Sequence, residues 1–318
     1  MKLLRIGSAI ILICSVAACI EMKNVSVFAS SVTTVTTATN TMIEADRSVC
    51  KTTNETLSEV SKFPGVGAMA NYDCVNLNKV LDSISGVNLV LENYGKALHD
   101  ISEDTFIGYD SDSTALQSTL KALPTNIKPS DDKIAAVSGL ASWIASVETQ
   151  DDREKAVEAA MSGNNGEMKE NFHKVVALLS ELSKQYEEAL TTNARITQAS
   201  IGIVKHDFAR CGSMTIVVTE NTGKTSGSAT PPKCEPVAVE EMTKRLTANL
   251  ELVDGTPASL TVAQMKAITD YRNSLDAMSK AFDAASQKQT SKQLLPEVIT
   301  FAKQARTVSQ SVQKAFPL

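Results

Sequence analysis

The fold is decided by residues 77–101, which read LNKVLDSISGVNLVLENYGKALHDI. Large apolar side chains recur there in steps of three and four residues, the period of a helix that packs lengthwise against partner helices. The seam consists of Leu77, Val80, Ile84, Val87, Leu91, Tyr94, Leu98 and Ile101. Gly86 and Gly95 lie within it, each costing about 1 kcal/mol relative to alanine. We interpret these glycines as places where a neighbouring helix approaches closely.

The same spacing predicts helices along most of the chain, and no repeat of fixed period accompanies it. The expected ranges are 32–61, 112–123, 131–147, 151–162, 166–203, 237–252, 257–286 and 292–316. Ser130 is typical of an N-cap, and Asp131 and Asp132 follow in the first turn, where the helix dipole favours acids. The sequence therefore predicts an all-α fold, an elongated antiparallel helical bundle over residues 32–318.

The amino-terminal segment has the features of an export signal. Lys2 and Arg5 are followed by residues 6–18, which carry no charge and end in small side chains. This apolar run is too short for a stable membrane span, which needs about 20 residues. We therefore expect residues 1–18 to be a cleaved signal peptide, and residues 19–31 to form a short tether before the bundle.

The end of this segment, Val16-Ala17-Ala18-Cys19, resembles the lipobox of bacterial lipoproteins. The resemblance implies that Cys19 becomes the mature amino terminus and carries a thioether-linked diacylglycerol. Several acyl chains give a firm anchor, because each buried methylene contributes about 0.8 kcal/mol. Residue 20 is Ile rather than the Asp that resembles an inner-membrane retention signal, so the expected location is the outer membrane of the cell envelope, facing the periplasm.

Four cysteines follow Cys19, and an even number in an exported chain indicates disulfides. Three pairings are open, and the local one, Cys50–Cys74 with Cys211–Cys234, needs no long-range assumption. Each such bridge stabilises by about 3 kcal/mol on the chain-entropy account. Residues 211–237 combine the strand-like SMTIVV with many turn residues, which predicts a small disulfide-closed loop or β-hairpin inserted into the bundle.

Composition and motifs argue against several kinds of function. The chain has 31 Lys and Arg against 36 Asp and Glu, with the cations scattered, so a nucleic-acid partner is not expected. Gly223-Lys224-Thr225 lacks the first glycine and the following helix of a phosphate-binding loop. His99, His173 and His206 lie far apart, and the sequence predicts no metal, cofactor or catalytic residue. A triad assembled from distant residues stays open.

These features predict a non-enzymatic, lipid-anchored envelope lipoprotein that serves as a helical scaffold or protein-binding module. Its expected contacts are the membrane, through the amino-terminal lipid, and a protein partner, through the insertion or an apolar face. Two alternatives remain. A pore-forming or membrane-active helical protein would need an apolar hairpin of about 40 residues, which the sequence lacks after residue 18. A small-molecule-binding, sensor-like bundle would need a pocket with convergent polar groups.

Overall fold

The computed structural model describes residues 19–61, 73–103, 114–123, 125, 128–146, 153–162, 166–213, 262–289 and 294–316. These residues form α1 (Met22–Val60), α2 (Cys74–Glu103), α3 (Thr114–Lys121), α4 (Asp131–Ser146), α5 (Arg153–Met161), α6 (Glu167–Ser213), α8 (Val262–Ala285) and α9 (Pro296–Ala315). The expected all-α class is confirmed. The signal peptide at 1–18 and the helix at 237–252 lie outside the described residues.

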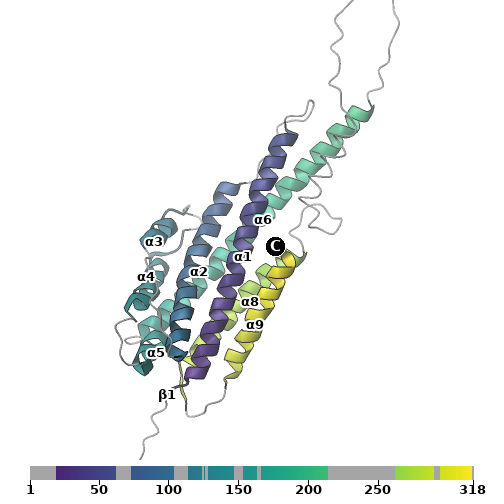
Figure 1. Ribbon diagram of the computed structural model, residues 1–318. Coiled ribbons are helices and arrows are strands. Elements are labelled where there is room, and N and C mark those ends of the chain that lie inside the picture. Colours follow the sequence, from purple (N-terminus) through teal and green to yellow (C-terminus); the bar gives the residue numbers. More distant parts are fainter. Residues whose placement is uncertain are drawn as a thin grey trace, which may run out of the picture.

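The long helices lie side by side in a bundle (Figure 1). α1 packs between α2 and α9, α8 packs against both α1 and α9, and α6 contacts α2, α4 and α8. α1 runs away from the end marked β1, and α2 returns towards it (Figure 1). The 47 residues of α6 correspond to roughly 70 Å at 1.5 Å per residue, so this helix extends beyond its neighbours.

The predicted seam of α2 is confirmed, because all eight of its residues are buried. Gly95 on this helix faces α1 at close range. A Cβ at position 95 would lie 3.1 Å from the Ala29 carbonyl oxygen and 3.2 Å from Val32 Cβ. The interpretation of Gly95 as a site of close helix approach is therefore correct.

The expected tether at residues 19–31 is wrong. α1 begins at Met22, ten residues before the predicted start, and the side chains of Val25, Phe28, Ala29 and Val32 are fully buried. The Ser/Thr-rich sequence is compatible with this helix because its hydroxyls donate to carbonyls one turn earlier. Thr39 Oγ1, for example, donates to the Val35 carbonyl oxygen at 2.8 Å. The buried hydroxyls of Ser31, Thr36 and Thr39 are thus satisfied within α1.

A ring cluster from four helices lies in the core beside this first part of α1. The Phe28 ring centroid is 5.8 Å from that of Phe172 on α6, 5.7 Å from that of Phe282 on α8 and 5.7 Å from that of Phe301 on α9. Phe172 and Phe282 stack at 4.0 Å. Although aromatic residues make up only 4% of the chain, several of them meet here, and α1 is joined to three other helices.

The first three residues of the predicted insertion at 211–237 are helical. α6 continues to Ser213, so Cys211 belongs to the last turn of this helix. The remainder of the insertion, with Cys234, lies outside the described residues. The chain therefore leaves the described part at the projecting end of α6 and re-enters it at Val262, where α8 begins.

Candidate functional site

The predicted lipid-attachment residue belongs to a short strand at one end of the bundle. β1 (Cys19–Ile20) pairs antiparallel with β2 (Lys288–Gln289), and Cys19 is opposite Gln289. Ile20 is buried at 9% exposure, and the buried side-chain oxygen of Asn24 accepts a hydrogen bond of 2.9 Å from the Leu295 backbone N–H. The chain is therefore held in place from Cys19 onward. Sequence patterns could not predict this pairing, because two-residue strands have no periodicity.

The predicted Cys50–Cys74 disulfide is confirmed, with a Cα–Cα distance of 5.9 Å. It joins α1 to the first residue of α2 and closes the chain across residues 51–73. Cys50 is 2% exposed. The second predicted pair, Cys211–Cys234, lies outside the described residues. A crosslink between the buried Cys50, ten residues before the end of α1, and the partly buried first residue of α2 is typical of a chain that folds in an oxidising compartment.

The structure brings His173 between a serine and an aspartate one turn apart on α8. His173 Nδ1 is 2.6 Å from Ser279 Oγ, and His173 Nε2 is 3.0 Å from Asp283 Oδ1. Lys169 Nζ lies 2.7 Å from the same Asp283 oxygen. Partial burial raises the pKa of Asp283, but hydrogen bonds from Lys169 and His173 lower it more, so the net shift is downward. Asp283 is therefore a carboxylate at neutral pH.

This Ser279–His173–Asp283 cluster has the partners of a hydrolytic triad, but its backbone setting differs from one. Acyl transfer needs N–H donors aimed at the developing oxyanion. Ser279 lies inside α8, where the amides of each turn donate to carbonyls four residues earlier. The His173 ring also packs edge-on against Phe282, with 5.9 Å between centroids. The arrangement is best explained as a polar link that holds α6 to α8 above the phenylalanine cluster.

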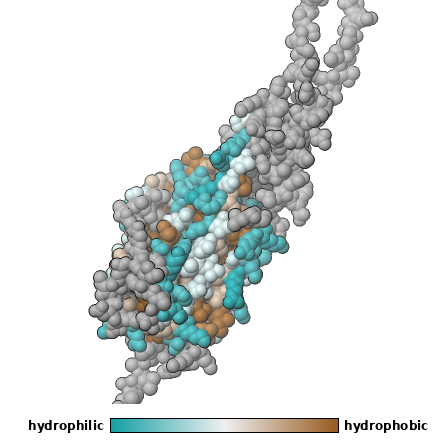
Figure 2. Space-filling model, in the orientation of Figure 1, coloured by the Kyte–Doolittle hydropathy of each residue, from teal (hydrophilic) through white to brown (hydrophobic). Residues whose placement is uncertain are grey.

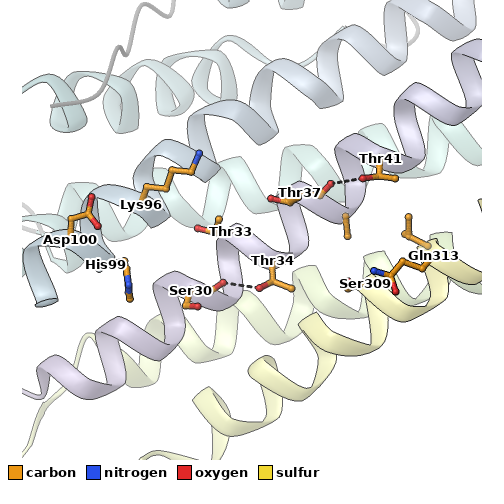
Figure 3. A pocket seen from close by; sticks show the side chains of 12 residues that line it. Ser30, Thr33, Thr34, Thr37, Thr41, Lys96, His99, Asp100, Ser309 and Gln313 are labelled. Carbon is orange, nitrogen blue, oxygen red and sulfur yellow. Dashed lines mark hydrogen bonds between the residues drawn. The ribbon is translucent and has the colours of Figure 1, made fainter. Parts of the chain in front are cut away.

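A groove runs along the solvent-facing side of α1, between α2 and α9 (Figure 3). Its volume is about 460 Å³, and hydroxyls from α1 form much of its lining. These hydroxyls are used within the helix: Thr34 Oγ1 donates to the Ser30 carbonyl oxygen at 2.9 Å, and Thr41 Oγ1 to that of Thr37 at 3.2 Å. The pale band along α1 in Figure 2 is this Ser/Thr face. The remaining polar groups of the groove come from Lys96, His99 and Asp100 on α2 and from Ser309 and Gln313 on α9.

Asp46 is the most unusual ionisable group in the described part of the core. Its side chain is 3% exposed on α1, and the buried Tyr186 hydroxyl of α6 donates a hydrogen bond to its carboxylate. Burial raises the pKa of Asp46 well above its ordinary value, because the charged form loses its water. Asp46 lies one turn after the buried Met42 on the same face of α1, but apolar spacing does not indicate that an acid is accepted there.

Metal-binding clusters and membrane-spanning helices are both absent from the described residues. No group of three or more His, Cys, Asp or Glu side chains there is arranged to hold a metal ion. No helix in the same part of the chain is long and apolar enough to cross a membrane.

Comparison with known proteins yields no relative. No family model matches this chain, and no curated protein or solved structure matches it either. The function must therefore be argued from the chain's own residues and geometry.

Replacing Asp46 with Asn tests the buried acid. Since burial raises the pKa of Asp46 in the folded state, the contribution of Asp46 to the free energy of unfolding is greatest below the ordinary carboxyl pKa of about 3.9 and falls as pH rises through the folded value. Asp46→Asn keeps an acceptor for Tyr186 and removes this titration. We expect the variant to be more stable than the natural protein at about pH 8, with the difference vanishing towards about pH 4, as measured by urea unfolding.

The matched control is Asp276→Asn, an exposed aspartate on α8, which should leave the pH dependence unchanged. An Asp46→Asn variant whose stability falls with pH as steeply as that of the natural protein would contradict the assignment.

The cluster around Ser279 gives a second prediction. Because the surrounding amides are bound within α8, we expect a fluorophosphonate probe, which labels activated serines, to leave the folded protein unmodified. A known serine hydrolase in the same reaction serves as the positive control. Labelling that is lost in Ser279→Ala would show a working nucleophile and overturn the interpretation of the cluster as a structural link.

Proposed function

We propose that this protein is a non-enzymatic lipoprotein of the bacterial cell envelope, anchored by acylated Cys19 in the outer membrane and facing the periplasm. The observation that carries the proposal is the Val16-Ala17-Ala18-Cys19 motif directly before the folded body. β1 contains Cys19, and α1 follows at Met22. A peptidase cut before Cys19 would thus leave the described body intact.

The body suits a scaffold that holds a contact surface at a distance from its anchor. α1 has 39 residues, which is about 58 Å of helix, and α6 is longer. Buried phenylalanines, the Cys50–Cys74 bridge and the His173 link connect these helices to their neighbours. In other proteins, rigid elements of this kind support the loops that bind partners. The proposed protein-binding segment is the insertion that follows the projecting end of α6.

The proposal is tested by the mass of the protein isolated from its native envelope. The natural protein should yield an amino-terminal peptide that begins at Cys19 and carries a diacylglycerol thioether and a further acyl chain. Cys19→Ser should lack this modification, since serine cannot form the thioether. Cys14→Ser is the matched control, because Cys14 lies in the segment expected to be removed, and its mature product should be identical to that of the natural protein. An unmodified sulfur at Cys19 would overturn the proposal.

A further inference from the structure

No extended linker separates Cys19 from the folded body. Cys19 pairs with Gln289, Ile20 is buried, and α1 begins at Met22. An extended tether over the thirteen residues 19–31 would reach about 45 Å, at 3.3–3.6 Å per residue. Here the residue proposed to carry the lipid is itself part of the body. Acyl chains on Cys19 can enter a bilayer only if this end of the bundle lies at the bilayer surface.

The surface around this end has apolar side chains suited to such a contact. Leu294 and Leu295, which precede α9, are half-buried, and Ile299 in its first turn is 37% exposed. The hydrogen bond from Leu295 to Asn24 places this turn beside the start of α1. Figure 2 shows hydrophobic side chains at the lower end of the molecule, where these two helices begin. The exposed charges at this end are mixed, with Lys23 on α1 and Glu297 on α9, so the apolar side chains are the basis for a lipid contact.

We infer that this end of the bundle, with Leu294, Leu295 and Ile299, docks directly on the phospholipid bilayer. The inference rests on the proposed acylation of Cys19 and adds a defined membrane-contacting face. The body then stands away from the membrane, because α1 starts at the docked end and runs away from it (Figure 1). The end of α6 at Ser213 projects on the opposite side, up to roughly 70 Å along that helix.

The test uses the full-length lipidated protein in liposomes of phosphatidylethanolamine and phosphatidylglycerol. A photo-crosslinking amino acid, p-benzoylphenylalanine, replaces Ile299 in one variant and Val75 in the other. Val75 is 67% exposed and lies in the first turn of α2. The other end of α2 is the one near the start of α1, because the His99 ring nitrogen lies 3.3 Å from Ser26 Oγ. Val75 is therefore far from the proposed membrane-contacting end. We expect lipid adducts at position 299 and only background at position 75. A flexible Gly/Ser spacer inserted between Cys19 and Ile20 should abolish the adducts at 299.

A second crosslinking variant at the exposed Glu297, in the same turn, guards against a local effect of replacing Ile299. Equal adducts at 75 and 299 would mean that the body lies flat, and would overturn the inference. Only background adducts at both 297 and 299, on protein whose Cys19 is acylated, would also overturn the inference. The proposed function would stand in that case. Protein recovered without acylated Cys19 would refute the proposed function and this inference together.

Discussion

The packing of Phe28 into a cluster of rings from three other helices is the interaction on which the rest of this structure depends. Phe28 is fully buried and lies only nine positions after Cys19. Its ring lies within 5.8 Å of Phe172, Phe282 and Phe301, measured between centroids. Removing a buried phenylalanine ring commonly costs about 3–5 kcal/mol. The start of α1 is therefore part of the core rather than an appendage.

The buried start of α1 determines where Cys19 lies relative to the far end of the bundle. Because α1 is fixed from its first turn, β1 pairs with β2 and Cys19 is held at the end where α9 begins. The Cys50–Cys74 bridge ties α1 to α2 further along, and α6 extends past them both. The molecule thus has an end proposed for lipid and an opposite end from which the insertion departs, joined by continuous helices.

Local periodicity predicted most of the helices, because the seam of α2 and the registers of α6, α8 and α9 place large apolar side chains every three or four residues. It failed before residue 32, where Val25, Phe28 and Ala29 keep this spacing but are interspersed with serines and followed by a Ser/Thr-rich stretch. Many of these hydroxyls donate hydrogen bonds to backbone carbonyls one turn earlier in the same helix, and composition alone does not show this. Contacts between distant residues were also beyond prediction: Ser279 and Asp283 meet His173 across more than 100 positions.

Native-state hydrogen exchange of the mature protein tests most directly whether the chain belongs to the core from its first residues. The account predicts that the backbone amides of Val25, Phe28, Ala29 and Val32 exchange as slowly as those of the α2 seam, through global unfolding alone. Fast exchange over residues 22–31, with protection starting only near residue 32, would instead show a tether. It would remove the basis for a body held directly at its anchor.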